Sequence, residues 1–221
     1  LKNYGAHLNR RVAQVHNELD AAGKPDPHLY LTDDVVCFDT GLYTERYENI
    51  YALFVPNTRE DASQKWYLKE FCKTSDPLLR DIDELPQRVR FTDNPVELVY
   101  DYRYRIRVNI DHILGDENNV RRVPESLQGP EKGMMLRRVL EGAIAEAERR
   151  VAANYMLAVP QYYNGRIQLL LPLCLTGDRP ELALAIQRED GYYAARTCLT
   201  IEMAYNNARL IARPEAAWIL P

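Results

Sequence analysis

The stretch LAVPQYYNGRIQLLLPL, residues 157–173, decides the fold because it contains the clearest turn signal in the chain. Asn164 and Gly165 suit the two central positions of a type I′ turn, which both require positive φ. The flanking runs, 157–163 and 166–173, have the length and apolar content of strands. The stretch therefore predicts an antiparallel hairpin. Alternate residues of its second strand share one face: Ile167, Leu169, Leu171 and Leu173.

Strand-like runs continue on both sides of this hairpin. Residues 182–188 alternate in the same way, Asp190 and Gly191 form a second tight turn, and residues 192–198 return along the first run. Four earlier runs rich in β-branched and aromatic residues predict an antiparallel meander: residues 28–31, 35–39, 50–55 and 65–71. Residues 96–102 fit a helix or a strand, as do residues 107–114, and periodicity does not decide between the two.

Helical spacing of apolar residues marks three further segments. The first extends from Tyr4 to Leu19, and Gly23 ends the pattern as a C-cap. Residues 131–155 have the clearest apolar stripe and form the longest predicted helix. Thr200 is a suitable N-cap for a last helix, which we expect to extend through residues 202–218.

Together these patterns predict the α+β class. The predicted architecture is an antiparallel (meander/hairpin) β-sheet, with a long central helix and N- and C-terminal helices packed on it. We expect a single domain over residues 1–221, because no flexible linker or internal repeat divides the sequence. The sequence starts without Met and inside a helical pattern, so we expect further residues or another domain upstream.

The composition narrows the expected location and partners. A formal net charge of −4 argues against a protein that coats nucleic acid by bulk charge. Arginine nevertheless accounts for 22 of the 28 basic residues, and guanidinium binds phosphate or carboxylate through two bonds. The four cysteines are far apart and lack metal-ligand spacing, which predicts reduced thiols and a cytoplasmic location. No apolar run reaches 18 residues, so we expect no membrane association.

The expected last helix contains the first candidate site. Glu202, Asn206 and Arg209 follow one another at i, i+4 and i+7, so they project from one face, and Asn207 borders that face. An asparagine and an arginine one turn apart can donate to one oxyanion, phosphate or base edge. The alternative is a buried polar network that holds the helix against the sheet, and the sequence leaves both open.

VNIDHILGDENNVRR, residues 108–122, contains the second candidate site. His112 can act as general acid or base near neutral pH, with Asp111 orienting it and Arg122 holding a phosphate. These groups would be sufficient for metal-independent phosphodiester cleavage, as in a nuclease. The alternative is that His112 has only a structural role. The acidic residues of this stretch match no calcium-binding loop, and we expect neither a metal site nor a cofactor.

The predicted hairpin and an earlier strand end supply the remaining candidates. Aromatic rings beside a positive charge suit single-stranded nucleic acid, because stacking accepts any base and arginine binds the backbone. The alternative is ordinary cross-strand packing of the tyrosines. In FDTGLYT, residues 38–44, Thr40 can offer its hydroxyl where Gly41 permits a bulge or a close approach, although a simple turn is the alternative. The hairpin candidates are Gln161, Tyr162, Tyr163 and Arg166.

Five strings resemble, in this order, the bacterial family catalogued as domain of unknown function 3825: LKNY, FDTGLYTERYENIYALF, VNIDHILGDENNVRR, AVPQYYNGRIQLLLPL and LTIEMAYNNARLIARPEAAW. The resemblance covers nearly the whole chain. Relatives occur in longer proteins beside small RNA-binding modules, such as cold-shock or LOTUS-type winged-helix domains. The resemblance therefore implies an RNA-related setting and a fused or associated RNA-binding domain, and it assigns no catalytic residues.

Our leading hypothesis is a domain that binds or processes single-stranded RNA in a groove lined by Arg, Asn and Tyr. A second hypothesis is a sensor of a small nucleotide, in which the same residues would line a closed pocket. A third is a non-catalytic module that binds a partner protein. No nucleotide-binding glycine loop, dinucleotide fingerprint, serine-hydrolase elbow or zinc-protease motif is present in the sequence. Whether the protein is an enzyme and how it oligomerises are left open by the sequence.

Overall fold

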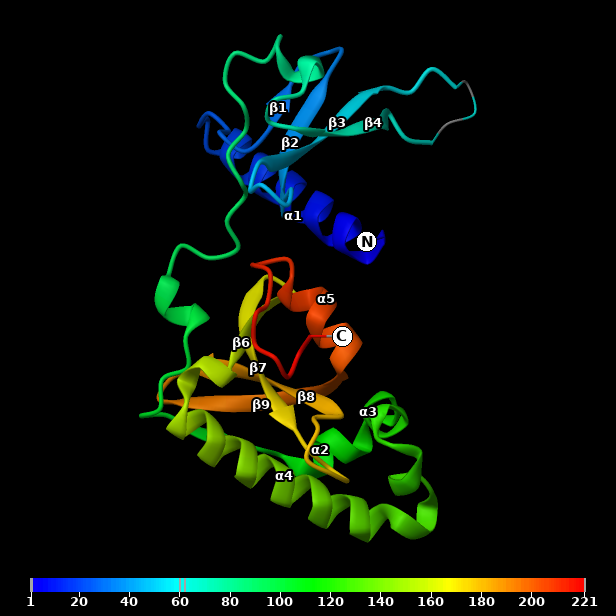
Figure 1. The fold of residues 1–221 in the computed structure, drawn as a ribbon, viewed down its shortest axis with the longest axis vertical. Helices are drawn as coiled ribbons and strands as arrows, with labels where there is room; N and C mark the ends of the chain where they lie inside the picture. The colour runs from blue at the N-terminus through cyan, green and yellow to red at the C-terminus, as the bar shows by residue number, and fades with distance from the viewer. Residues whose placement is uncertain (1, 60, 62, 221) are drawn as a thin grey trace. The chain divides into compact units, whose positions relative to one another are not determined.

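A computed structural model describes residues 2–59, 61 and 63–220, and the chain divides into two compact units, Leu1–Arg90 and Phe91–Pro221 (Figure 1). Both helices and antiparallel sheets are present, so the predicted α+β class is confirmed. The strands form two sheets, one in each unit. That residues 1–221 act as one domain stays a prediction. In the part of the chain that is described, no helix has the length and apolar character needed to cross a membrane.

The first unit contains one long helix and a four-stranded antiparallel sheet in the order β1-β2-β3-β4. The helix α1 ends as predicted, because Gly23 adopts φ 63° and the Lys24 N–H donates to the Leu19 carbonyl at 2.9 Å. A 3₁₀ turn, η1 (Pro77–Leu79), follows the sheet. The elements are α1 (Lys2–Ala21), β1 (Tyr30–Leu31), β2 (Val36–Tyr43), β3 (Asn49–Pro56) and β4 (Trp66–Lys73).

The second unit contains a five-stranded sheet in the order β5-β9-β8-β7-β6, antiparallel except where the short β5 pairs with β9 in parallel. Its strands are β5 (Arg105–Arg107), β6 (Val159–Tyr163), β7 (Arg166–Leu173), β8 (Leu182–Glu189) and β9 (Tyr192–Thr200). Its α-helices are α2 (Ile110–Gly115), α3 (Glu117–Arg122), α4 (Gly133–Ala153) and α5 (Ile201–Ala208). Short 3₁₀ turns connect them: η2 (Pro95–Leu98), η3 (Glu125–Leu127), η4 (Pro130–Lys132) and η5 (Tyr155–Leu157).

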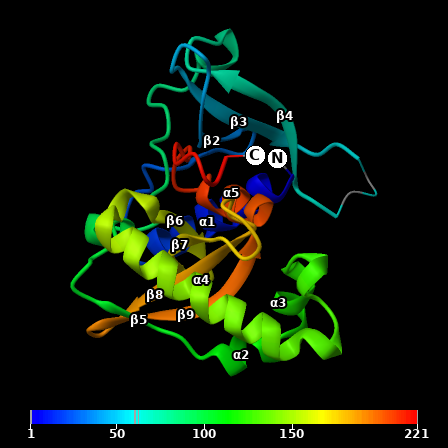
Figure 2. The same cartoon turned by 60° about the horizontal axis from the view of Figure 1, so that its bottom comes forward.

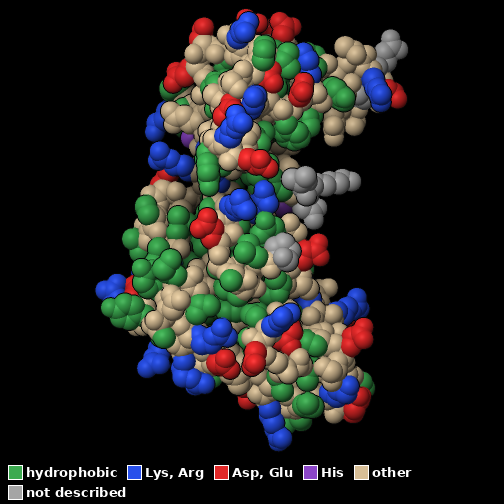
Figure 3. Space-filling view, viewed as in Figure 1, with side chains coloured by type: hydrophobic (Ala, Val, Ile, Leu, Met, Phe, Trp, Pro, Cys, Tyr) green, Lys and Arg blue, Asp and Glu red, His purple; other side chains and the backbone are tan. Residues whose placement is uncertain are grey.

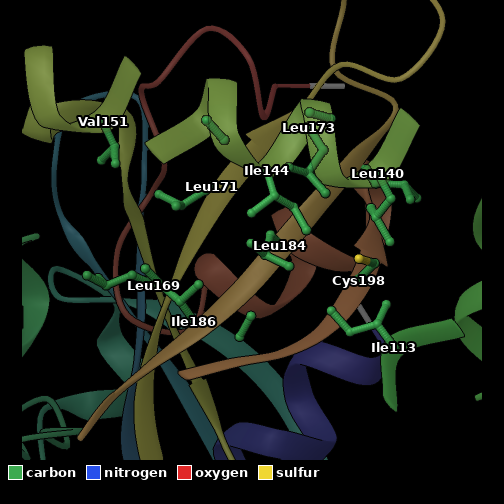
Figure 4. Packing of buried hydrophobic residues seen from close by; sticks show 14 of the residues in the cluster. Ile113, Leu140, Ile144, Val151, Leu169, Leu171, Leu173, Leu184, Ile186 and Cys198 are labelled. Carbon is green, nitrogen blue, oxygen red and sulfur yellow. The ribbon is translucent and has the colours of Figure 1, made fainter. Parts of the chain in front are cut away.

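Helices cover both faces of this second sheet. Figures 1 and 2 show α4 along one face and α5 on the other. Because side chains alternate along a strand, Leu169 and Leu171 of β7 pack toward α4, whereas Leu170 packs toward α5. Figure 4 shows the α4 face, where the labelled residues of the helix and of the strands interlock: Leu140, Ile144, Val151, Leu169, Leu171, Leu173, Leu184 and Ile186. We name these two surfaces the α4 face and the α5 face.

The hairpin predicted from residues 157–173 is confirmed. Asn164 has φ 48° and Gly165 φ 82°, as a type I′ turn requires, and Tyr163 pairs with Arg166 on either side of it. The second tight turn is confirmed as well, with Gly191 at φ 77° between β8 and β9. These two turns lie at the same end of the sheet. The first turn precedes β7 and the second follows β8, and because β7 and β8 are antiparallel, the start of β7 lies beside the end of β8.

The predicted extent of the last helix was wrong. Thr200 caps α5 as expected, since its hydroxyl oxygen accepts the Met203 N–H at 3.2 Å, but the helix ends at Ala208. The two asparagines before that point have low helix propensity. Beyond it the chain tightens, because the N–H groups of Leu210 and Ile211 donate to carbonyls three residues back, and Pro214 has no N–H to continue a helix.

All four cysteines are free thiols, and three of them are buried. Burial raises the pKa of Cys37 and of Cys198 to about 12, and it raises the pKa of Cys72 as well. Since the thiolate is the reactive form, these three should react slowly with a thiol reagent, whereas the partly exposed Cys174 should react first. Timed alkylation of the native protein followed by mass spectrometry tests this, and Cys174→Ser should remove the fast phase. Equal labelling rates at all four thiols would contradict the burial of Cys37, Cys72 and Cys198.

Candidate nucleic-acid interface

The polar residues of α5 join a row of buried amides on the sheet. The Asn207 side-chain N–H donates to the Gln161 oxygen at 3.0 Å, and Gln161 donates to Gln168 at 2.8 Å. Gln168 in turn contacts Gln187 at 3.4 Å, and Gln187 donates to the Glu189 carboxylate at 3.0 Å. Two predicted ligand residues, Asn207 and Gln161, are therefore brought together, and their side-chain amides hydrogen-bond each other.

Strand register explains why these amides meet. Gln161 and Gln168 are directly opposite in the β6–β7 pair, and the β7–β8 register places Gln187 next to Gln168. We call Gln161, Gln168 and Gln187 the inner row. Each of the three side chains is at least nine-tenths buried, and all three are hydrogen-bonded. Buried amides cost free energy unless they are paired, so the inner row fixes the register of three strands.

A second row crosses the α5 face nearer the turns. Arg105 of β5 pairs with Tyr192 of β9, Tyr192 pairs with Glu189 of β8, and Tyr163 pairs with Arg166 at the end of β6 and β7. These residues lie on the same face as the inner row. Tyr163, Arg166 and Glu189 are each two residues from a glutamine of the inner row, and side chains two residues apart on a strand share a face. Tyr192 is opposite Glu189, and Arg105 is opposite Tyr192. We call these five residues the outer row.

The outer row is more open to solvent than the inner row. Arg105, Arg166 and Tyr163 are exposed, and Tyr192 and Glu189 are half-buried. The guanidinium of Arg107 lies 4.1 Å from the centre of the Tyr192 ring, and Arg196 forms an ion pair with Glu189. Figure 3 shows lysine and arginine side chains along the margin of the second unit where Figure 1 places the tips of β8 and β9. The outer row thus alternates arginine with tyrosine around one neutralised carboxylate.

The residues proposed for catalysis do not form hydrogen bonds with one another. Asp111 pairs with Arg137 of α4 at 2.5 Å, and this guanidinium lowers the pKa of the Asp111 carboxyl. His112 is exposed on α2, where its backbone N–H donates to the Asn109 side chain at 3.0 Å. The Asp111 carboxylate that was expected to orient the imidazole is therefore directed at another partner.

Arg122 is engaged in a structural network with Asn119. Its Nη1 donates to the Cys198 carbonyl at 2.6 Å and lies 3.3 Å from the Asn119 oxygen. Asn119 is buried and accepts from the Cys198 N–H at 3.2 Å and from the Thr197 hydroxyl at 2.6 Å. The pairing of β5 with β9 ends at Ala194, so among the described residues β9 has no neighbouring strand on that side beyond this position. The side chains of Asn119 and Arg122 from α3 instead form hydrogen bonds with the backbone N–H and carbonyl of Cys198. Arg122 therefore acts here as a substitute for a neighbouring strand.

The other residues of α5 point elsewhere. The Nη1 of Arg209 donates to the Tyr205 hydroxyl at 2.9 Å, and its guanidinium lies 5.9 Å from the centre of that ring. Arg209 is the C-cap of α5 and keeps a helical backbone, with its N–H donating to the Tyr205 carbonyl at 3.0 Å, so it stays in helical register with Glu202 and Asn206. Glu202 is exposed in the first turn, and Asn206 is half-buried. Of the four candidates in this segment, only Asn207 joins the inner row.

Two further candidates have mainly structural partners. Tyr162 packs edge-on against Phe91, with the ring centres 4.9 Å apart, on the α4 side of β6. Thr40 belongs to the first unit, where its hydroxyl donates to the Ile50 carbonyl and accepts the Leu42 N–H at 3.2 Å. Gly41, at φ 69°, forms the bulge that was one of its predicted roles. Both of the Thr40 hydroxyl contacts are thus used to hold the bulge.

Acidic residues near α2 and α3 also have protein partners. Asp116 caps α3 by accepting the Asn118 N–H at 2.9 Å, and Glu117 pairs with Arg121 at 3.0 Å. Over the described ranges, no group of three or more His, Cys, Asp or Glu side chains has the placement needed to hold a metal ion.

Comparison with protein families gives one match. The model of the family described as Domain of unknown function (DUF3825) matches residues 2–218. The chain belongs to this family. No curated protein and no solved structure matches the chain. The resemblance seen in five strings of the sequence is thereby confirmed for nearly the full length of this DUF3825 chain.

In this DUF3825 protein, sequence reasoning missed the residues that complete the outer row. The signal was present as YDYRYRIRV, residues 100–108, in which tyrosine and arginine alternate with strand periodicity. Arg105 and Arg107 fall on the α5 face because Ile106, between them, packs toward α4. Tyr192 follows the second predicted turn directly. Neither segment could be placed beside the 157–173 hairpin without the strand order.

Proposed function

We propose that this protein binds single-stranded RNA in the cytoplasm, with the outer row as the contact surface. The observation that supports this best is the set of arginines and tyrosines that four strands, β5, β9, β7 and β6, place at one end of the second sheet. An arginine stacked on a tyrosine, as Arg107 is on Tyr192, presents a fixed cation beside an aromatic ring. Such a surface accepts phosphates through arginine and bases through stacking, with little dependence on sequence.

The proposal is one of binding rather than cleavage. Phosphodiester chemistry at His112 would use a carboxylate to orient the imidazole and an arginine to hold the phosphate. Asp111 is paired with Arg137, and Arg122 is bonded to the Cys198 carbonyl. The two expected partners of His112 are therefore engaged elsewhere, whereas Arg166 and Tyr163, which were proposed for binding, lie side by side and exposed.

The test is the affinity for a fluorescent single-stranded RNA, measured by anisotropy over a series of salt concentrations. Each phosphate contact contributes about 0.7 to the slope of log affinity against log salt for a single strand. Arg166→Ala should therefore reduce the slope by about 0.7 and weaken binding at low salt by roughly fivefold.

Arg121→Ala is the matched control, because Arg121 is exposed on α3 and pairs only with its helical neighbour Glu117. It removes the same charge and should change neither the slope nor the affinity beyond about 0.5 kcal/mol. Circular dichroism shows whether both variants are folded. No binding of RNA by the folded wild type, or equal losses in the two variants, would refute the proposed surface.

A further inference from the structure

A pocket lies at the same end of the second sheet. Its strand residues come from both faces: Ile167, Leu169, Arg188 and Tyr193 face α4, and Arg166 and Gln187 belong to the α5 face. It has a volume of about 340 Å³, is open to solvent on one side, and is lined by the sheet and by the segment that begins at Phe91. Apolar side chains of Ile167, Leu169 and Tyr193 form part of its wall. Volumes of roughly 300–1,000 Å³ are typical of small-molecule sites. Polar atoms make up more of the surface of this pocket than apolar atoms do. The polar groups of this pocket therefore determine what it can hold.

A carboxylate stands on one side of the pocket. Glu97 belongs to η2, whose start is capped by Asn94 through the Val96 N–H at 3.2 Å. The Thr92 hydroxyl, also in the pocket wall, donates to Glu97 Oε2 at 2.7 Å. An ionised carboxylate accepts about four hydrogen bonds in total, so Glu97 keeps acceptor capacity for a ligand. Its position is fixed by a short, capped turn.

Two arginines contribute the opposite charge. Arg188 lies 4.9 Å from the centre of the Tyr104 ring, and its Nη2 is 3.6 Å from the Asp101 carboxylate. These contacts orient its guanidinium while most of its five N–H donors stay available. Arg166 also lines the pocket, next to the turn glycine Gly165. The Glu97 carboxylate would repel a simple anion, and the two arginines would repel a simple cation. A ligand that carries both hydrogen-bond donors and a negative charge fits better.

We propose that this pocket binds a guanine nucleotide. Guanine offers N–H donors on one edge and the acceptors O6 and N7 on another, which match a fixed carboxylate and an arginine. Its phosphate would pair with the second arginine, and its planar ring would lie against the apolar wall. Adenine offers only its exocyclic N–H₂ group as a donor, so it matches the two carboxylate oxygens less well. This site is separate from the proposed RNA surface except for Arg166.

Isothermal calorimetry of the full chain with GMP, IMP and AMP tests the proposal. IMP lacks only the 2-amino group of GMP, and we expect it to bind about tenfold more weakly, the equivalent of about 1.4 kcal/mol. Glu97→Gln should weaken GMP binding by at least tenfold and should reduce the preference for GMP over IMP. Glu117→Gln is the matched control, since Glu117 is exposed on α3, and it should leave binding unchanged.

No heat of binding with GMP at millimolar concentration, or equal affinities for GMP, IMP and AMP, would overturn the assignment. Oligouridine distinguishes this failure from failure of the RNA surface, because it can bind the outer row without guanine. Displacement of GMP by a guanine-containing RNA, but not by oligouridine, would identify the ligand as a guanine within RNA. A free nucleotide is indicated if neither RNA displaces GMP.

Discussion

Replacing Asn119 by Ala is expected to lower the free energy of unfolding by about 2–4 kcal/mol, because it leaves two buried backbone groups without partners. The Cys198 N–H loses its acceptor, and the Ile113 carbonyl loses the Asn119 side-chain N–H that lies 3.0 Å away. Arg122 would retain its bond to the Cys198 carbonyl but lose the Asn119 oxygen. Urea denaturation followed by circular dichroism measures the change.

Asn118→Ala provides the control at the next position of the same helix. Asn118 is exposed, and its side chain contacts only Asp116 at the cap, so the variant should differ from the wild type by about 0.5 kcal/mol or less. Both substitutions exchange asparagine for alanine in α3, so helix propensity is matched. Equal stability of the two variants would show that the edge of β9 does not depend on Asn119.

Much of the second unit could be predicted because its signals are local. Asn164 and Gly165 set the turn, and the leucines after them set the side of the strand that is buried. The long helix predicted for 131–155 is observed as Gly133–Ala153, since its apolar stripe matches the helical period over more than five turns. Such features need no knowledge of distant residues.

The division of the strands between two sheets could not be predicted in this way. Several of the longer strands, such as β2, β7 and β8, are similar, nearly continuous buried runs, and nothing in the sequence of a strand specifies its neighbour. The pairing of β5 with β9 joins segments almost ninety residues apart, such as Arg105 with Tyr192. The end of the last helix was missed for another reason: each apolar residue from 210 to 218 fits a helix, but the asparagines and Pro214 outweigh that pattern.

The candidate sites show the same limit. Asn207 and Gln161 were chosen separately and prove to be hydrogen-bonded, because α5 packs over β6. Asp111 and Arg122 were grouped with His112 by proximity in sequence, and each instead binds a group from another element. Proximity in sequence does not specify the partner of a long side chain, because that side chain can reach groups that the tertiary structure brings close from other elements.

The largest effect on RNA binding is expected from reversing two charges on β5. Arg105→Glu with Arg107→Glu removes two phosphate partners and places two carboxylates beside Tyr192 of the outer row. We expect binding to weaken at least 100-fold at about 0.1 M salt, where charges closer than about 10 Å are only partly screened. The double variant should approach the wild type as salt rises, because both lose the ionic contribution. Anisotropy over the salt series measures this.

Arg138→Glu with Arg149→Glu is the matched control, since both arginines are exposed on α4, which covers the opposite face of the sheet. Either pair of substitutions changes the net charge by four, from −4 to −8, so bulk repulsion is the same in both variants. A loss confined to the β5 variant therefore reports the position of the charges. If both variants lose affinity equally, the RNA senses only net charge, and the outer row is not the contact surface.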